Sequence, residues 1–165
     1  MPKSTPSARA IKIKLDYVTF KMDIVSERAK EVASKVYQRE VGLGLRELRL
    51  MRFIGSYPGL TLSSLVVQTH VEKTLVSKAV TALVARELVV RSIGEADARK
   101  ISLHLTKKGE KLVKEADFIG QRMEKKLMQD IPEEDVVVFR RCLELLYEAS
   151  DEMMEMAGSH LKQVK

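Results

Sequence analysis

Small hydroxyl side chains and lysines recur between residues 72 and 87 at a spacing that gathers them on one face of a predicted helix. This polar set is Lys73, Thr74, Ser77, Lys78 and Thr81. The apolar residues predicted to face the core are Leu75, Val76, Ala79, Val80, Leu83 and Val84. Short polar side chains allow a helix backbone to approach base edges, and lysine can donate to guanine acceptors in the major groove. A solvated helix face has the same appearance, so this face alone leaves both interpretations open.

Asp97 and Arg99 stand in a loop between two segments with strand character. Residues 88–93 are rich in β-branched side chains and residues 100–105 alternate between apolar and polar, which predicts a β-hairpin. An arginine at the hairpin tip can enter a narrow minor groove, where the negative potential is enhanced. Asp97 can accept from an arginine or from loop amides and so hold the loop in shape. Further positive charge nearby comes from Arg91 and Lys100. A hairpin tip with ordinary surface charges is the alternative.

Thr61 and Ser63 mark a possible contact with phosphates at the start of a short helix predicted over residues 62–68. Thr61 is a suitable N-cap for that helix. The amides at a helix N-terminus bind phosphate oxygens, and Lys73 at the start of the next helix can hold another. A turn at residues 69–71 separates the two helices, so the region predicts a helix-turn-helix followed by a wing.

Long helices are predicted before this region. From Leu15 the apolar residues alternate at spacings of three and four for three heptads, which indicates a helix packed against other helices, possibly those of a partner chain. Gly42 and Gly44 end it. A second helix is expected over residues 45–56, before Pro58 and Gly59.

Two further helices are predicted after the hairpin. Thr106 can cap the first of them, and Pro132 with the acidic residues after it begins the second. The apolar face of the last helix is broad: Val138, Cys142, Leu145, Leu146, Ala149 and Met153. One neighbouring helix does not need so wide a face, so we expect a partner chain to cover part of it. On this stripe Cys142 is expected to be a buried, inert thiol.

The composition is that of a globular protein. The chain has 165 residues, 45% of them apolar and 32% charged, with a formal net charge of +6. The charge is +6 over residues 1–59, +4 over 60–112 and −4 over 113–165, so the motif-bearing half is basic, as a polyanion partner requires. A single cysteine, no secretory signal and no apolar run of membrane-spanning length favour a cytoplasmic, nucleoid-associated protein.

Catalytic and metal sites are not indicated. The three histidines, at positions 70, 104 and 160, have no helical pairing and no cysteine partner, so neither a metal nor another cofactor is expected. We find no nucleophile–base pair and no phosphate loop, so the chain is not expected to be an enzyme.

A small-molecule site is suggested by one face of the second helix, which carries Arg46, Leu50, Phe53 and Tyr57. Arg46 can pair with a carboxylate, and the two aromatic side chains can border a ring. Met22 and Phe118 are candidates to close such a pocket. The alternative is ordinary helix packing with Arg46 at its rim.

These blocks together resemble the MarR family of winged-helix transcriptional regulators. The resemblance rests on LRELRLMRFI, GLT at 59–61, VEKTLVSKAVTALVARELV, the Asp97-x-Arg99 wing, and the Leu105-Thr106-x-x-Gly109 step, in this order and spacing. It implies a dimer built from the N- and C-terminal helices, DNA recognition by the helix holding Ser77 and Lys78, minor-groove contact by Arg99, and a pocket between the dimer helices and the DNA-binding lobe. The chain departs from the family at His70, where glycine is usual, at Glu72, where a better N-cap is expected, and in a wing without prolines.

We therefore expect a mostly α protein with a small β-hairpin wing, and no membrane partner. The expected parts are a basic arm (1–14), a dimerisation helix (15–42), a winged helix-turn-helix (43–112) and C-terminal dimerisation helices (113–165). The expected function is a homodimeric repressor that binds a pseudo-palindromic double-stranded DNA operator and is released by a small hydrophobic or aromatic anion. A protein-interaction module and a non-specific architectural DNA-binding protein are the alternatives.

Overall fold

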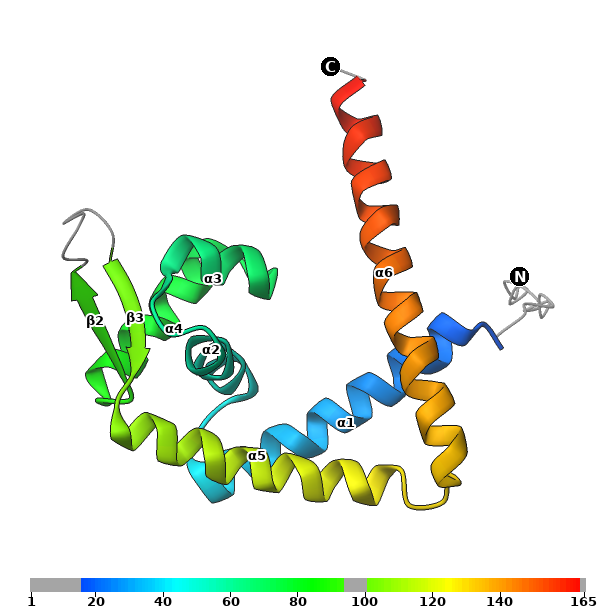
Figure 1. The fold of residues 1–165 in the computed structure, drawn as a ribbon, viewed down its shortest axis with the longest axis horizontal. Coiled ribbons are helices and arrows are strands. Elements are labelled where there is room, and N and C mark those ends of the chain that lie inside the picture. Colours follow the sequence, from blue (N-terminus) through cyan, green and yellow to red (C-terminus); the bar gives the residue numbers. More distant parts are fainter. Residues whose placement is uncertain (1–15, 94–100, 164–165) are drawn as a thin grey trace, which may run out of the picture. The chain divides into compact units, whose positions relative to one another are not determined.

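The computed structural model describes residues 16–93 and 101–163 (Figure 1). These described residues form two compact units, divided between Ile119 and Gly120. The elements are α1 (Val18–Val41), α2 (Leu45–Ser56), β1 (Leu60–Thr61), α3 (Leu62–Thr69), α4 (Lys73–Ala85), β2 (Val89–Ile93), β3 (Ile101–Leu105), α5 (Lys107–Leu127) and α6 (Glu133–Gln163). The predicted fold class, mostly helical with a small β-hairpin, is confirmed. None of the helices in the described ranges combines the length and apolarity needed to cross a membrane.

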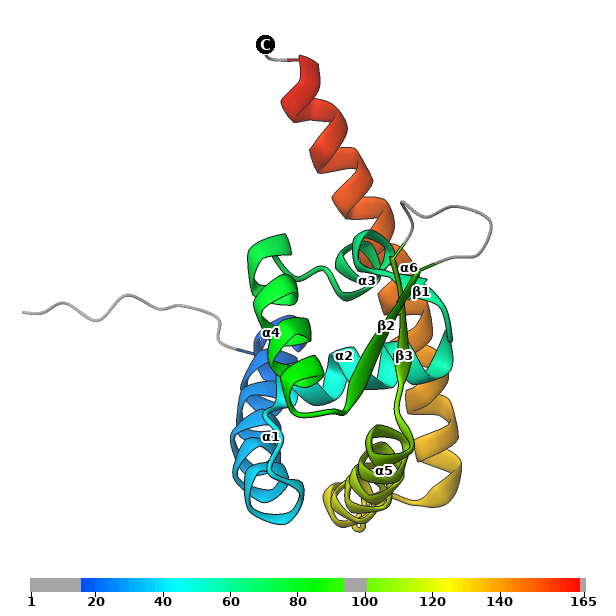
Figure 2. The ribbon, with the colours of Figure 1, turned by 90° about the vertical axis from the view of Figure 1, so that its left-hand side faces the viewer.

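The helix α2 is the centre of the first unit, where it packs against α1, α3, α4 and β3 (Figures 1 and 2). Its buried residues are Leu48, Leu50, Met51 and Ile54. They meet the buried apolar residues of the neighbouring elements, which include Tyr37, Leu43, Leu65, Val76, Val80, Leu83 and Leu103. The polar face of α4 is therefore turned outward because its apolar stripe is used against α2 and α3.

The sheet has three antiparallel strands in the order β1-β3-β2. The hairpin of β2 and β3 was predicted, and Arg91 pairs with Leu103 in its register. The two-residue strand β1 was not predicted, because it is too short to show an alternating pattern. It pairs Leu60 with Leu103 and Thr61 with Ser102, and so fixes the start of α3 to β3.

The turn from α4 to β2 is held by the beginning of α5. Three consecutive carbonyl groups accept hydrogen bonds: that of Arg86 from Lys108 Nζ at 3.0 Å, that of Glu87 from Thr106 Oγ1 at 2.7 Å, and that of Leu88 from the Thr106 amide at 3.1 Å. The same Thr106 hydroxyl accepts from the Gly109 amide at 3.0 Å, so Thr106 caps α5 as predicted. This turn fixes where α4 ends and where the wing begins.

Glu87 in this turn adopts a left-handed backbone conformation, with φ of 59°. This conformation costs a residue with a Cβ atom roughly 1–2 kcal/mol of conformational free energy, whereas glycine adopts it without that cost. We expect Glu87→Gly to raise the free energy of unfolding by about 1 kcal/mol, measured by urea denaturation. Glu87→Ala is the matched control, since it removes the same side chain but keeps the Cβ. Equal gains in the two variants would show that the side chain, not the backbone, is responsible.

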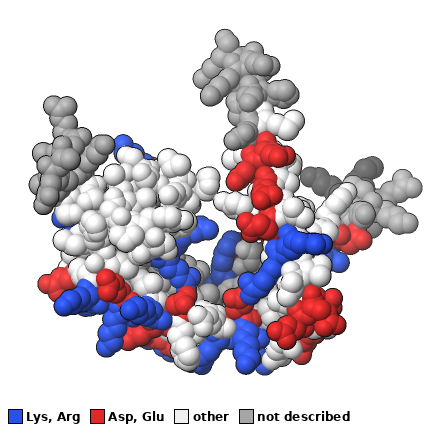
Figure 3. All heavy atoms as spheres, in the orientation of Figure 1, with Lys and Arg blue, Asp and Glu red and all other residues white. Residues whose placement is uncertain are grey.

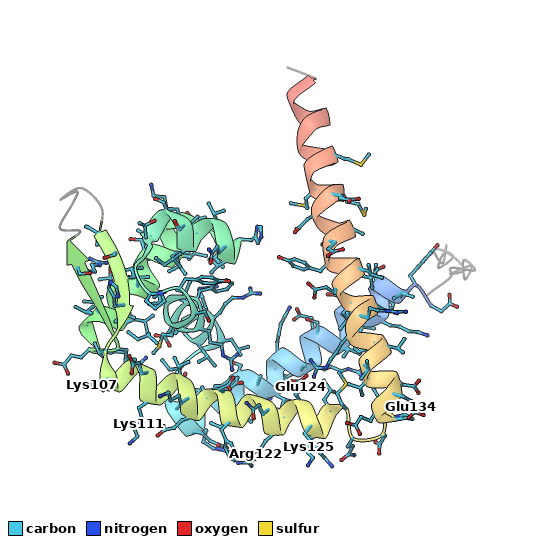
Figure 4. The ribbon with its side chains drawn as sticks, in the orientation of Figure 1. Lys107, Lys111, Arg122, Glu124, Lys125 and Glu134 are labelled. Atoms are coloured by element: carbon cyan, nitrogen blue, oxygen red, sulfur yellow. The ribbon has the colours of Figure 1, made fainter. Side chains whose placement is uncertain are left out.

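The second unit contains the end of α5 and the whole of α6. Glu124 of α5 (labelled in Figure 4) forms an ion pair with Arg140 of α6. The predicted broad apolar face of α6 is exposed in the single chain, with Leu145 at 59% and Met153 at 71% exposure. Cys142 is also exposed, so the expectation of a buried thiol is wrong for the isolated chain, because none of the described elements of this unit covers the stripe.

Candidate nucleic-acid interface

The helices α3 and α4 form the helix-turn-helix. Within α3, the buried Thr69 hydroxyl donates to the Leu65 carbonyl at 2.7 Å. His70 then takes the left-handed conformation, with φ of 52° and ψ of 26°, at the position where glycine was expected. The turn therefore keeps its geometry despite the departure from the family pattern, since histidine is among the residues that tolerate this region.

Glu72 caps α4, which corrects the expectation that it is a poor N-cap. Its carboxylate accepts from the amide of Thr74 at 2.9 Å and from that of Leu75 at 3.3 Å. The glutamate side chain reaches the first-turn amides although it is longer than the usual capping residues. A carboxylate at the helix N-terminus is also stabilised by the helix dipole.

A hydrogen bond with the Thr74 side chain, and then those from the Thr74 and Leu75 amides, lower the pKa of Glu72 from its usual value of 4.5. The charged carboxylate therefore stabilises the fold in full above pH 4.5, the usual pKa. This stabilisation is lost as the pH falls through the lowered pKa of Glu72. We expect Glu72→Gln to have a lower urea midpoint than the parent at neutral pH and the same midpoint in strong acid. A difference that persists unchanged into strong acid would show that the charge of Glu72 makes no contribution.

The outward face of α4 carries the predicted polar set. Lys73, Thr74, Lys78 and Thr81 are exposed, and Ser77 is half-buried at one edge. The buried side is formed by Val76, Val80 and Leu83. Leu75 was predicted to face the core but is 38% exposed, because it lies about 100° around the helix from Val76.

Arg91 on β2 is joined to this face. Its Nη2 donates to Thr81 Oγ1 at 3.0 Å, and both side chains are exposed. Two of the predicted DNA-binding residues, Thr81 of α4 and Arg91 in the middle of β2, are thus brought together. The Thr81 hydroxyl accepts from Arg91 and keeps its own proton available for donation.

Thr61 and Ser63 lie at the start of α3. The Thr61 hydroxyl accepts from the Ser64 amide at 3.2 Å, so the predicted N-cap is confirmed, and Ser63 is exposed beside it. Asp97, Arg99 and Lys100 lie outside the described residues. The strands β2 and β3, which flank this segment, are linked by the Ser92 and Ser102 hydroxyls, whose oxygens are 2.7 Å apart.

Arg86 anchors the other end of α4, a role that was not predicted from the sequence. Its Nη1 lies 3.2 Å from Glu47 Oε1, and its Nη2 donates to the Gly42 carbonyl at 2.8 Å. Glu47 Oε2 accepts from the Gly44 amide at 2.9 Å. The C-terminal end of α4 is therefore tied to the junction of α1 and α2. Arg86 is 39 positions from Glu47 and 44 positions from Gly42, so no local sequence pattern predicts these contacts.

The suggested small-molecule stripe is only partly open. Phe53 and Tyr57 stack with ring centroids 6.5 Å apart and an interplanar angle of 21°. Arg46 is exposed, but Leu50 is fully buried and contributes to the core. Met22 and Phe118, on α1 and α5, are exposed at 37% and 63%.

Charge is unevenly spread over the described surface. The region around α3 has few charged side chains, and α3 itself has none, whereas lysine and arginine gather with acidic residues around the start of α5 (Figure 3). Lys111 is one of these, and its side chain extends from α5 away from α2 (Figure 4). Within the described ranges, no three His, Cys, Asp or Glu side chains are grouped as a metal ion requires.

Comparison with known proteins gives a consistent result. Residues 41–100 match the sequence model of the MarR family. A MarR/EmrR family transcriptional regulator from Acinetobacter sp. ADP1 is similar in structure, with a TM-score of 0.75, 20% identity, and coverage of 85% of this chain and 99% of the other. No curated protein matches the sequence.

Two similar structures contain DNA. Streptococcus pneumoniae FabT in complex with DNA has a TM-score of 0.73 and 21% identity, covering 82% of this chain and 96% of the other. The S. aureus MepR–DNA complex has a TM-score of 0.69 and 20% identity, covering 81% and 96%. At this identity the likeness concerns the fold.

Proposed function

We propose that this chain, which belongs to the MarR family through residues 41–100 and has the fold of its transcriptional regulators, is a sequence-specific DNA-binding repressor that acts as a homodimer. The observation that carries the proposal is the outward face of α4. A helix capped at Glu72 and anchored at Arg86 presents lysine and small hydroxyl side chains, with Arg91 of the wing bound to the same face. The DNA in the FabT and MepR structures supports it.

In this proposal α4 enters the major groove. Lys78 and Ser77 contact base edges, and Lys73, Thr74, Thr81 and Arg91 lie along the groove walls. The start of α3, with Thr61 and Ser63, contacts phosphates through its amides and hydroxyls. Arg99 enters the adjacent minor groove, with Asp97 holding the loop and Lys100 adding charge.

Dimerisation is proposed from the apolar surfaces that each unit leaves exposed. On α1 these include Phe20, Val25 and Val32, and on α6 Leu145, Leu146 and Met153. Exposed apolar patches of this extent mark interaction sites. A dimer with two-fold symmetry places two α4 helices in successive major grooves, about 34–36 Å apart, and requires a pseudo-palindromic operator. The arm (1–14), the helical dimerisation regions (15–42 and 113–165) and the winged helix (43–112) remain the proposed division, and the proposed location is cytoplasmic, at the nucleoid.

The regulating ligand is proposed to be a small hydrophobic or aromatic anion. Arg46 is exposed in the first turn of α2, and Phe53 and Tyr57 stack at the other end of this helix, so the two ends offer a partner for a carboxylate and a surface for a ring. Met22 and Phe118 are the proposed walls. A ligand lowers DNA affinity only to the extent that it prefers a dimer geometry that does not match the operator.

The test is selection from a random duplex pool by the purified full-length protein, followed by fluorescence anisotropy on the enriched and a scrambled duplex. We expect a specificity ratio of ~10³ or more at physiological salt. Affinity should fall by ~10³–10⁵ between about 50 and 200 mM salt if a dimer makes roughly 6–10 phosphate contacts. Enrichment of no sequence, with weak and equal binding, would support an architectural protein. No binding to any duplex would support a protein-interaction module.

A further inference from the structure

Leu75 is an exposed apolar residue on the face that we assign to DNA. It is 38% exposed, whereas Val76, Val80 and Leu83 on the same helix are completely buried. Val76, Val80 and Leu83 pack α4 against the rest of the first unit, so Leu75 is not needed for the hydrophobic core.

Leu75 shares an edge of α4 with Lys78 and Ala82, at spacings of three and four residues. Lys78 and Ala82 are both exposed. Ser77 occupies the opposite edge. The outward face therefore has an apolar edge, Leu75 and Ala82, beside the lysine, and a hydroxyl edge on the other side. We call the first the Leu75 edge.

Two amides at the start of α4 are already occupied and do not bind phosphate. The Glu72 carboxylate accepts from the Thr74 and Leu75 amides, the groups that would otherwise receive an anion, and it adds a negative charge there. The hydrogen bond from the Leu75 amide also fixes the backbone from which the leucine side chain projects. Beside Lys73 and Thr74, this end of the helix therefore presents an apolar side chain whose backbone is held in place.

We propose that the Leu75 edge reads thymine, by contact of Leu75 and Ala82 with the C5-methyl groups in the major groove. The thymine methyl is the only apolar group that a base pair displays in that groove, so an exposed apolar edge next to a base-contacting lysine has one complementary feature to meet. The N-terminal residues of a recognition helix are also those nearest to the bases. The inference rests on the proposed function.

The test uses the duplex that the full-length protein enriches from a random pool. Each thymine is replaced in turn by deoxyuridine, which differs only in lacking the methyl group. For the parent protein we expect at least one position in each half-site where this replacement weakens binding roughly fourfold, the factor for burial of one CH₂-sized group. Leu75→Ala should bind the thymine and deoxyuridine duplexes equally at that position.

Val67→Ala is the matched control, because Val67 is 71% exposed on the neighbouring helix α3 and is not on the Leu75 edge. This variant should keep the sensitivity to deoxyuridine. Thermal melting verifies that both variants are folded, and alanine is a favourable residue within a helix.

The inference is overturned if the parent is indifferent to deoxyuridine at every position, or if Leu75→Ala is as sensitive as the parent. It is also overturned if the enriched half-sites contain no thymine. In each of these cases an enriched duplex exists, so the proposed function stands. If no duplex is enriched, the proposed function fails and the thymine contact fails with it.

Discussion

Replacement of Gly109 with alanine should lower the free energy of unfolding by about 3 kcal/mol, at the upper end of the usual effect of overpacking. A Cβ at this position would lie 2.1 Å from the Leu88 carbonyl oxygen, which is backbone and has no rotamer with which to move aside. The same carbonyl accepts from the Thr106 amide. Relief of the clash therefore requires α5 to move away from the turn and to lengthen that hydrogen bond.

Thermal and urea denaturation of the full-length protein measure the effect. For a chain of this size, about 3 kcal/mol corresponds to a fall in Tm of roughly 6–12 °C. Gly44→Ala is the matched control, because Gly44 has an ordinary φ of −76° and its Cβ would meet the nearest atom at 3.7 Å. This variant should change stability by less than about 1 kcal/mol. Equal effects of the two substitutions would show that the close approach of α5 to Leu88 is not a constraint on the fold.

The helices could be predicted because each has a strong apolar period and local signals at its ends. Thr61 and Thr106 cap α3 and α5 as predicted, and the predicted range 45–56 agrees with α2. The hairpin was recognisable from the β-branched β2 and the alternating β3. These are local properties, so a single sequence is sufficient for them.

The missed features depend on contacts between distant residues or on fine differences of angle. The anchor of Arg86 on Glu47 and Gly42 joins parts of the chain far apart in sequence. Leu75 is apolar and adjacent to Val76, but a rotation of about 100° decides which of them is buried. Residue type alone therefore assigned Leu75 to the core. The outward polar face was predictable because lysine and hydroxyl residues are rarely buried at that density.

Replacement of both Ser77 and Lys78 with alanine should reduce the specificity ratio by about 10- to 100-fold, since a base contact of this kind is worth roughly 1–3 kcal/mol. Lys78 is exposed and Ser77 lies at the edge of the outward face, and Val76 and Val80 stay buried, so the first unit should keep its fold. Binding to a scrambled duplex should change much less, because non-specific affinity depends on the sum of phosphate contacts and not on base edges.

Lys111→Ala separates the loss of a base contact from the loss of a charge. Lys111 is 80% exposed on α5 and carries the same charge as Lys78, but it extends away from α2 and is not on the outward face of α4 (Figure 4). The Lys111→Ala variant should bind the enriched and the scrambled duplex more weakly by the same small factor, so the ratio of the two affinities should stay unchanged. If the double substitution behaves like the control, with equal losses on both duplexes, Lys78 contacts phosphate. Sequence discrimination would then have to come from the wing or from the Leu75 edge. If it lowers only the affinity for the enriched duplex, the lysine and serine of α4 read bases, and the slope of affinity against salt should change little.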